Sequence, residues 1–544
     1  MRPSLASLAD RPFDVIVVGG GINGAGIARE AQLAGFRTLL VERNDFGSGT
    51  TSRATRLIHG GLRYLEHGEL GLVYESLSER EALLQDAGHL VRPLRLLVPV
   101  YAGDARPAWK VRAGLVLYDL LSFRKSLPRH RAVPVARVDE LAPALEREGL
   151  RAAFTFYDAQ VEFPERLVID TVVDFAAAGG VPLNHATAEA IVSPGGVVRA
   201  LQVRDELSGD TGEIEAKVIV NAAGPWVDLV LAGSDAERHE PLIGGTKGSH
   251  LVVEWPDAPH HAVFASARAD GRPFFILPWY RYTLIGTTDI RYDGDPSRAE
   301  ATADEVRYLL DETRRLFPSS PLSEEHVLYT YSGVRPLPYT RDGEEGSITR
   351  SHFVIDHTKR GGPTGLFSIV GGKLTTYRSL SRIAVAAMRK QISPSGPPRT
   401  LARASQRTAP QASGHLDEAP LSLYGVRAPD VQALIAREPS LGTPIGPGHA
   451  ELRAQIAYAV EAEHAQTMAD VLLRRLPAGW TKGHALDAVD AVADVMARRL
   501  GWDGERKSRE TAEYRRELAQ TLVPLSAIAG LDAGSRAASE PGIR

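Results

Sequence analysis

A short apolar run, a glycine-rich turn, a helical pattern and a second apolar run follow one another between residues 13 and 42. The apolar runs read DVIVV and FRTLLVE, and GGGINGAG and IAREAQLAG lie between them. Uninterrupted short apolar runs are typical of buried strands, and apolar residues three or four positions apart are typical of a helix. The segment is therefore predicted to form a strand, a tight turn, a helix and a second strand.

The rest of the first four hundred residues mixes the same two patterns. Short β-like runs occur at 218–220, 250–254, 274–277 and 283–286, and helical stretches occur at 167–178 and 304–316. This mixture predicts an α/β fold, in which a Rossmann-like nucleotide-binding domain is interleaved with a second, mainly antiparallel β domain.

The pattern changes towards the C-terminus. Residues 399–420 are polar and small, which is typical of a linker, and helical patterns follow, for example at 451–476 and 484–500. We therefore predict an all-α C-terminal domain. The predicted boundaries are 1–400 for the two interleaved domains, 401–421 for the linker, 422–530 for the helical domain and 531–544 for a flexible tail.

Composition narrows the function classes. The chain has 544 residues, 43% hydrophobic and 24% charged, and its net charge of -4 is too balanced for a protein that coats nucleic acid. It has no cysteine, so redox chemistry would need a bound cofactor. No histidine and carboxylate cluster has the spacing of a metal site, so no metal is predicted. No stretch reads as a membrane-spanning helix or a secretion signal.

The glycine turn carries the motif Gly19-x-Gly21-x-x-Gly24. In a dinucleotide-binding turn these glycines permit the sharp turn, the close approach of a pyrophosphate and the packing of the helix on the strand. Glu42 ends the second predicted strand, where an acidic side chain would bind the ribose hydroxyls. The motif does not distinguish NAD from FAD, but the small, hydroxyl-rich loop 47–52 suits a pyrophosphate with a bulky ring system.

Seven segments resemble, in this order, the FAD-dependent, quinone-linked glycerol-3-phosphate dehydrogenase family: DVIVVGGGINGAGIAREAQLAG, GSGTTSRATRLIHGGLRYLE, NAAGPW, KGSH, IGTTD, YSGVRPL and GGKLTTYR. The resemblance implies that sn-glycerol 3-phosphate is oxidised to dihydroxyacetone phosphate by hydride transfer from C2 to flavin N5. It also implies electron transfer to a membrane quinone. By the same resemblance FAD would be held, without a covalent bond, by Gly19, Gly21, Gly24, Glu42, Arg43, Thr50, Ser52, Gly224, Gly372, Leu374 and Thr375.

Oxidising a phosphorylated secondary alcohol requires a group that accepts the hydroxyl proton and cations that bind the phosphate. Arg335, Arg350 and Lys373 are candidate cations inside or beside the matching segments. Arginine binds phosphate oxygens bidentately, whereas lysine offers a point charge. An antiparallel hairpin could bring the two arginines together across a loop rich in glycine and glutamate. Asp289 in IGTTD reads as a turn-capping residue and is left out of the predicted site.

By resemblance, the substrate is surrounded by His59, Tyr64, His250, Arg335, Arg350 and Lys373. We assign Arg350, Lys373 and Tyr64 to the phosphate, and Arg335 to the alcohol and its developing oxyanion. His250 is the preferred proton acceptor because an imidazole titrates near neutral pH, and His59 is the rival for that role. Lys373 could instead stabilise the reduced flavin.

Nine lysines and arginines lie between Arg92 and Arg131, against two aspartates and interleaved with apolar residues such as Trp109. This alternation suits a surface that rests on anionic lipid, and the resemblance implies the same association. We therefore expect a cytoplasmic protein bound peripherally to the inner face of the plasma membrane. The alternative is a solvated basic surface, or a rim that steers the phosphate inward.

Three other functions stay open. A glycerol-3-phosphate oxidase would differ only in passing electrons to oxygen, and the basic, apolar stretch favours quinone instead. A flavin oxidase of small amino acids would need a single bidentate arginine, so two arginines and a lysine favour a phosphate. A non-catalytic flavin-binding redox sensor or scaffold would be expected to lack some of these cations. No nucleic-acid partner is expected, and the resemblance is compatible with a homodimer.

Overall fold

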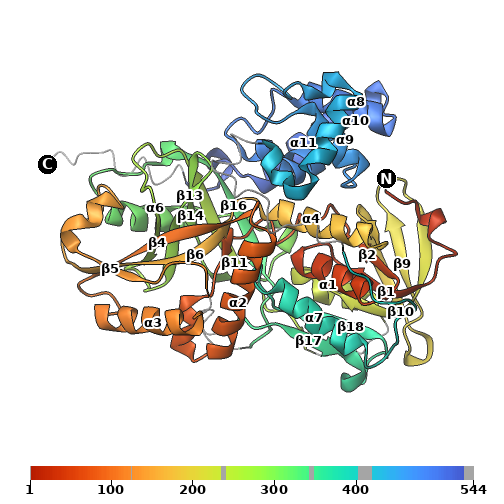
Figure 1. Ribbon diagram of the computed structural model, residues 1–544, viewed down its shortest axis with the longest axis horizontal. Helices are drawn as coiled ribbons and strands as arrows, with labels where there is room; N and C mark the ends of the chain where they lie inside the picture. The colour runs from red at the N-terminus through yellow and green to blue at the C-terminus, as the bar shows by residue number, and fades with distance from the viewer. Residues whose placement is uncertain (1, 124, 235–239, 342–347, 402–419, 532–544) are drawn as a thin grey trace.

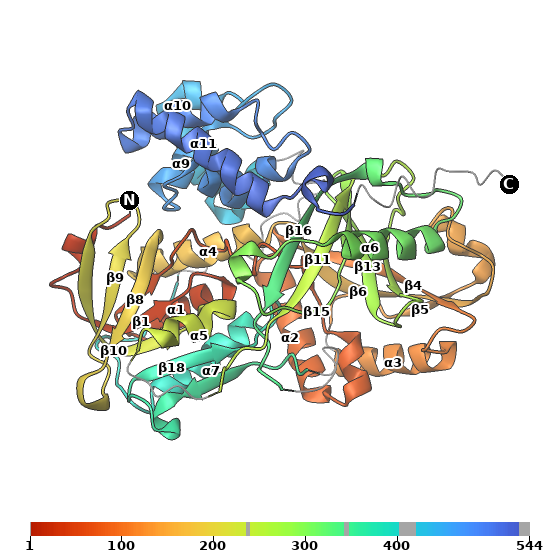
Figure 2. The same cartoon turned by 180° about the vertical axis from the view of Figure 1, so that it is seen from behind.

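Two β-sheets lie side by side, and a group of C-terminal helices packs above them (Figure 1, Figure 2). The computed structural model describes residues 2–123, 125–234, 240–341, 348–401 and 420–531. The predicted linker and tail lie almost wholly outside these ranges, so the predicted domain boundaries stay predictions. Within the described chain, no helix combines the length and the apolar character needed to span a bilayer.

The first sheet has eight strands in the order β17-β18-β10-β1-β2-β7, with β9 paired to β10 and β8 to β9. The central strand β1 pairs in parallel with β10 and β2, and all its residues are buried. A continuous apolar run is what such a strand requires, because both of its faces are covered. The bounds are β1 Phe13–Val18, β2 Thr38–Val41, β7 Val181–Leu183, β8 Ala186–Val192, β9 Ala200–Asp205, β10 Thr211–Asn221, β17 Phe353–Asp356 and β18 Leu366–Val370.

Helix α1 (Ile22–Leu33) connects β1 to β2 and packs against α4 (Pro164–Ala177) and α7 (Tyr377–Met388). The short α5 (Val227–Ala232) follows β10. The predicted order of strand, turn, helix and strand is therefore confirmed, and so is the Rossmann-like domain that it indicated.

The second sheet has ten strands in the order β15-β11-β14-β13-β12-β4-β6-β3, with β16 on β11 and β5 on β6. Nearly all its pairings are antiparallel, as predicted, and β12 with β4 is parallel. The helices α2 (Leu70–Asp86), α3 (Ala108–Leu121) and α6 (Ala303–Leu316) flank it. The bounds are β3 Leu57–Ile58, β4 Val91–Tyr101, β5 Arg131–Val133, β6 Leu150–Val161, β11 Thr246–Val253, β12 Ala262–Ser266, β13 Pro273–Trp279, β14 Tyr282–Gly286, β15 Ile290–Arg291 and β16 Val327–Arg335.

The C-terminal region is helical, as predicted, but the pattern at 451–476 does not form one helix. Helix α9 (Arg453–Glu461) ends early, His464 has a left-handed φ of +62°, and a π-helical turn, η13 (Asp470–Arg475), follows. Asp470 accepts hydrogen bonds from the backbone N–H groups of Gln466 and Thr467, which stabilises this break. The other helices are α8 (Ala428–Arg437), α10 (Val489–Leu500) and α11 (Gly504–Thr521).

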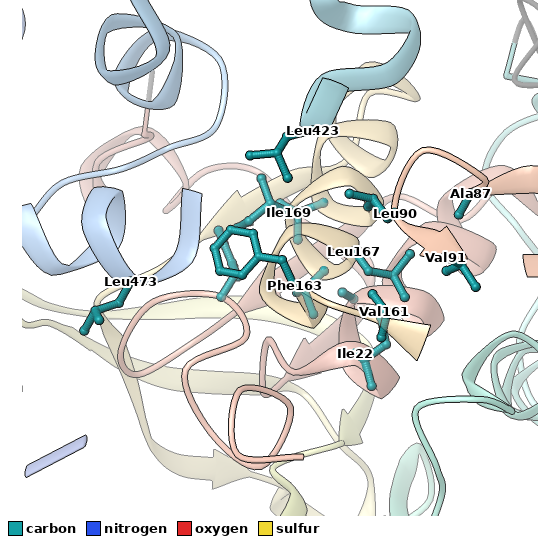
Figure 3. Packing of buried hydrophobic residues seen from close by; sticks show 14 of the residues in the cluster. Ile22, Ala87, Leu90, Val91, Val161, Phe163, Leu167, Ile169, Leu423 and Leu473 are labelled. Carbon is teal, nitrogen blue, oxygen red and sulfur yellow. The ribbon is translucent and has the colours of Figure 1, made fainter. Parts of the chain in front are cut away.

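The C-terminal region shares a hydrophobic core with the nucleotide-binding domain. Figure 3 shows Leu423 close to Ile169 of α4, and both belong with Leu473 of η13 to one buried cluster. Each of these side chains is less than 2% exposed. The helices are therefore packed on the Rossmann-like domain by apolar contact, which is the main stabilising contribution to such an interface.

Candidate active site

The glycine turn after β1 forms one wall of a cavity of about 250 Å³. Gly19 has a φ of +106°, and a Cβ there would lie 2.6 Å from the carbonyl oxygen of Ala222. A Cβ on Gly24 would lie 1.8 Å from the carbonyl oxygen of Gly19. At Gly21, which lines the cavity, a Cβ would approach only the Thr51 hydroxyl, at 3.4 Å. The first and third glycines are thus required by the fold, and the second leaves room for a ligand at the start of α1.

Glu42 holds this turn from the end of β2. Its carboxylate accepts hydrogen bonds from the backbone N–H of Gly20 at 2.6 Å and of Asn44 at 2.8 Å. Burial raises the pKa of the Glu42 carboxyl, and the two backbone donors oppose the rise. Glu42 also lines the cavity, where its oxygens can accept hydrogen bonds from ribose hydroxyls.

Most of the predicted cofactor residues line this cavity: Gly19, Gly21, Glu42, Arg43, Thr50, Gly224, Gly372 and Leu374. The other three do not. Gly24 lies beneath the turn, the Ser52 hydroxyl donates to carbonyl oxygens of its own loop, and the Thr375 hydroxyl accepts a hydrogen bond from the backbone of His59 at 3.1 Å. These three residues support the wall from behind.

Two buried polar atoms in the cavity wall, Asn23 Oδ1 and Trp226 Nε1, lack a hydrogen-bond partner within the described chain. Buried polar atoms are normally paired, so these two indicate a ligand that would pair them. Sequence reasoning missed both, because it used the segments around them only for their glycines. The glycine turn, Glu42 and these open polar atoms together fit an adenine dinucleotide such as FAD.

A second cavity, of about 190 Å³, adjoins the first. Ala54 lines the first cavity and Thr55 the second, and likewise Pro336 lines the first and Arg335 the second. The second cavity is bounded by strands of the antiparallel sheet, for example by Phe275 of β13. A molecule in the second cavity would therefore lie beside a cofactor that occupies the first.

Arg335 and Arg350 meet in the second cavity on one carboxylate. Arg335 Nη1 donates to Asp289 Oδ1 at 2.9 Å, and Arg350 Nη2 donates to Asp289 Oδ2 at 2.8 Å. Burial alone would raise the pKa of Asp289, but the two guanidinium groups outweigh it and hold this pKa below its usual value. Arg350 Nη1 is buried without a partner within the described chain. The pair is thus fixed in place and still has a donor to offer an anion.

The suggestion that an antiparallel hairpin could bring these arginines together is wrong. Arg335 ends β16, which pairs with β11, whereas Arg350 precedes β17, which pairs with β18 in the other sheet. Asp289, which sequence reasoning left out as a turn cap, brings them together instead. Arg63 and Arg272 also line this cavity, and the sequence analysis did not single them out. Arg63 could have been found, because it lies in the matching segment IHGGLRYLE.

Lys373 and Tyr64 lie at the junction of the two cavities. Lys373 lines the first cavity and Tyr64 the second, and Lys373 Nζ is 4.4 Å from the centre of the Tyr64 ring. Lys373 Nζ also donates to Ser76 Oγ at 2.8 Å. Burial lowers the pKa of Lys373 to about 8, although Glu75 and Glu69 oppose the decrease. This position is compatible with both roles considered for the lysine.

The two candidate histidines differ in access to the second cavity. His59 lines it, whereas His250 of β11 is 2% exposed and is not part of its wall. His250 Nε2 is 2.9 Å from the hydroxyl of Thr55, which does line the cavity, and its ring stacks on Tyr331 at 4.7 Å. Burial lowers the pKa of His59 to about 4 and that of His250 well below its usual value. Both imidazoles are therefore neutral near pH 7, rather than titrating there as the sequence analysis assumed.

The basic residues counted between residues 92 and 131 lie on several different elements, and part of their charge is paired. Arg92 and Arg95 lie on β4, and Arg106 is paired with Glu66 at 2.8 Å. Lys125 is paired with Asp119, and Arg124 lies outside the described residues. Exposed apolar side chains lie on α3 and just after it, beside the exposed Lys110 and Arg112: Trp109 is 73% exposed, Leu120 65% and Phe123 70%. Helix α3 lies on the side of the molecule away from the C-terminal helices (Figure 1).

Comparison with known proteins identifies the family to which the chain belongs. A family model described as FAD dependent oxidoreductase matches residues 14–378, and one described as the C-terminal domain of alpha-glycerophosphate oxidase matches residues 384–507. The glycerol-3-phosphate dehydrogenase of Synechocystis sp. is 41% identical over 538 residues, covering 94% of this chain and 97% of that protein. The chain belongs to the FAD-dependent glycerol-3-phosphate dehydrogenase family. FAD, predicted from the sequence, is confirmed as the cofactor of this family.

Solved structures agree with this placement. The glycerol-3-phosphate dehydrogenase from Bacillus halodurans, complexed with FAD, superposes with a TM-score of 0.73 at 28% identity and covers 96% of this chain and 97% of that one. One relative of this chain has a different name. D-Erythritol 1-phosphate dehydrogenase of Brucella abortus is 37% identical to this chain, over 85% of this chain and 93% of that protein. Both of these relatives are named after the oxidation of a phosphorylated polyol.

Proposed function

We propose that this protein oxidises sn-glycerol 3-phosphate to dihydroxyacetone phosphate with bound FAD and passes the electrons to a membrane quinone. The observation that carries this proposal is the Arg335–Asp289–Arg350 group, which lines a small cavity beside the cofactor cavity. A carboxylate that binds two arginines orients both without using all their donors. The remaining donors suit a phosphate, which needs more hydrogen bonds than a carboxylate ligand does.

Each side chain has a separate role in the proposed reaction. Arg350 donates to the phosphate, with Tyr64 and Lys373 at the same end. Arg335 faces the reacting hydroxyl and stabilises the negative charge that develops on its oxygen. His59 accepts the hydroxyl proton, because it is neutral and lines the cavity, whereas Thr55 separates His250 from the cavity. When bound, FAD supplies the two-electron acceptor for the hydrogen on C2.

The choice of His59 reverses the preference drawn from the sequence alone. His250 keeps a supporting role in this proposal, since its Nε2 bonds to Thr55 and its ring packs on Tyr331. The backbone around His59 is fixed, because the next N–H, that of Gly60, donates to the hydroxyl of Tyr118 at 2.8 Å. A fixed backbone keeps the His59 side chain at the cavity wall, where a general base must lie to reach the substrate.

Anaerobic addition of glycerol 3-phosphate to the purified holoprotein is expected to bleach the flavin absorbance. Glycerol, glycine and lactate are expected to leave it unchanged, because none carries a phosphate for Arg350 to bind. D-Erythritol 1-phosphate belongs in the same panel, given the name of one relative. Bleaching by glycine alone would overturn the proposal in favour of an amino-acid oxidase. Absence of bleaching by every compound would support a flavoprotein without turnover.

A third cavity, of about 280 Å³, supports a quinone rather than oxygen as the acceptor. It shares Leu62, Arg63, Phe264 and Pro273 with the substrate cavity, and it is bounded on its other side by α3. An apolar cavity between the substrate cavity and an exposed apolar helix suits a quinone that arrives from a bilayer. In the bleaching experiment, the reduced protein should reoxidise faster with a quinone than with oxygen, and the reverse order would identify an oxidase.

Peripheral binding to anionic membranes is proposed to use the exposed face of α3. Replacing Trp109, Leu120 and Phe123 together with serine is expected to weaken binding to vesicles of phosphatidylglycerol by about tenfold or more, because each removes apolar surface that would enter the interface. Vesicle sedimentation measures this binding, and raised ionic strength should weaken it for the wild type. The control is Val197→Ser with Leu486→Ser, which are 53% and 37% exposed elsewhere on the molecule. Equal loss in the control would contradict the assignment to α3.

A further inference from the structure

One loop, residues 42–56, connects the end of β2 to the start of β3 and serves both cavities. Ser48, Gly49, Thr50 and Thr51 line the cofactor cavity. Directly after them, Thr55 lines the substrate cavity, and His59 follows beyond β3. The shape of both cavities therefore depends on where this loop is held.

The first attachment of the loop is Asp45, which is completely buried but does not line the cofactor cavity. Its carboxylate accepts hydrogen bonds from Arg474 Nε at 2.8 Å, from both terminal nitrogens of Arg475, and from Asn184 Nδ2 at 2.9 Å. Arg474 and Arg475 belong to η13 in the C-terminal region. A bidentate, fully buried ion pair of this kind fixes geometry strictly, because removing one partner leaves an uncompensated charge.

The second attachment is at the other end of the loop. Arg56, also completely buried, contacts the rings of both Trp279 and Trp480, at 4.6 and 4.4 Å from their centres. Arg56 Nη1 donates to Glu165 at 3.2 Å, so its charge is compensated. Trp480 comes from the C-terminal region, whereas Trp279 comes from β13. Arg53 adds a contact, since its Nη2 donates to Thr521 of α11 at 3.3 Å.

Asp45, His185 and Asp470 also lie close enough together to bind a metal ion. The ion pairs already present argue against that use. Arg474 and Arg475 bind Asp45, Arg474 Nη2 donates to Asp470 at 2.9 Å, and His185 Nε2 is 2.9 Å from Asp470. The negative charge in this cluster is compensated by arginine, as expected for a permanent domain contact.

We infer that the C-terminal helical domain is a functional part of the FAD site: by holding residues 45–56 at both ends, it keeps the loop in the conformation that binds FAD. Asp45 and Trp480 are then positioning residues, which act on the cofactor without touching it. Binding of FAD and docking of the C-terminal domain are coupled, and the coupling is reciprocal because both equilibria share one loop conformation. This inference goes beyond the proposed function and does not depend on the substrate or on the electron acceptor.

The first test measures FAD affinity in variants of the attachments. Asp45→Asn keeps the size of the side chain but removes the charge that Arg475 and Arg474 bind, and Trp480→Phe shortens the aromatic contact with Arg56. Each is expected to raise the FAD dissociation constant, measured by flavin fluorescence on the full-length protein, by about tenfold or more. The control is Arg499→Gln, which removes ion pairs to Glu438 at 2.7 Å and Glu461 at 2.8 Å, all within the C-terminal region. Folded variants with wild-type FAD affinity would overturn the inference.

The second test needs no substitution, so it still decides the matter if Asp45→Asn does not fold. Amide hydrogen exchange of the wild-type protein is compared with and without FAD. Because the coupling is reciprocal, FAD is expected to slow exchange at residues 470–480 as well as at 45–56, by about tenfold or more. Slowed exchange confined to the residues around the cofactor cavity, with 470–480 unchanged, would contradict the inference. Neither measurement uses the substrate, so their failure would leave the proposed function untouched.

Discussion

Replacement of Arg350 by leucine is expected to lower kcat/KM for glycerol 3-phosphate by about 10²–10³-fold. Arg350 Nη1 is buried and without a partner in the described chain, so it has a donor for the phosphate. Charge-assisted hydrogen bonds contribute about 1.5–3 kcal/mol each, and about 1.4 kcal/mol corresponds to a factor of ten. The substitution also leaves Asp289 with one arginine fewer, and the less compensated carboxylate repels the dianionic substrate.

The kinetic constants separate the roles of the two arginines. Arg350→Leu is expected to act mainly on KM, because the phosphate is bound equally in the ground state and in the transition state. Arg335→Leu is expected to lower kcat as well, because the charge on the substrate oxygen develops only in the transition state. Steady-state assays with a soluble quinone measure both. Arg341→Leu serves as the control, since Arg341 is 71% exposed and pairs with Glu240 at the surface. A wild-type KM in Arg350→Leu would rule out phosphate binding by this residue.

The cofactor site could be predicted from the sequence because its determinants are local. Gly19, Gly21 and Gly24 lie within one turn, and the steric reasons for Gly19 and Gly24 involve the turn itself and Ala222, which directly follows β10. Glu42 follows at the end of the next strand, so its position is fixed by the length of α1 and β2. Trp226 lines the same cavity but lies far along the sequence from this turn, and the sequence analysis used only the glycine beside it.

Four of the six residues predicted to surround the substrate line the second cavity, but their arrangement was not predicted. Arg335 and Arg350 were identified, but the element that joins them was not, because Asp289 comes from a loop after β14 and meets them only in the folded protein. An aspartate beside a turn can also cap that turn with a local hydrogen bond, and no pattern in the sequence excluded this role for Asp289. Ion pairs between residues far apart in the chain leave no periodic pattern in the sequence from which they could be predicted.

The surface around α3 shows a different limit of prediction from the sequence. Counting charges between residues 92 and 131 gave a basic stretch, but β4 and several ion pairs divide that charge. Trp109, Val116 and Leu120 are seven and four positions apart, which places them on one helix face, and all three are exposed. Their spacing was readable from the sequence. Which face of the helix points outwards was not, because that depends on the packing of Leu115 and Tyr118 against the sheet.

Replacement of His59 by asparagine is expected to lower the rate of anaerobic flavin reduction by glycerol 3-phosphate by about 10²–10⁴-fold, the usual contribution of a general base. Asparagine is close in size and keeps a polar group at the cavity wall. His250→Asn is the matched variant, and a decrease of about tenfold or less is expected, because His250 acts through Thr55. Stopped-flow absorbance measures both rates. A nearly normal rate in His59→Asn together with a lost rate in His250→Asn would return the role of base to His250.

The pH dependence of the same rate provides a second discrimination. A general base must be unprotonated, so its activity is present above its pKa and is lost as the pH falls through that value. Burial lowers the pKa of His59 to about 4, and Asp158 only partly opposes the decrease. At saturating substrate the reduction rate of the wild type is therefore expected to stay constant from about pH 8 down to about pH 6, where an ordinary imidazole would already be mostly protonated. A decline centred near pH 6.5 would contradict this, since it requires an imidazole in contact with water.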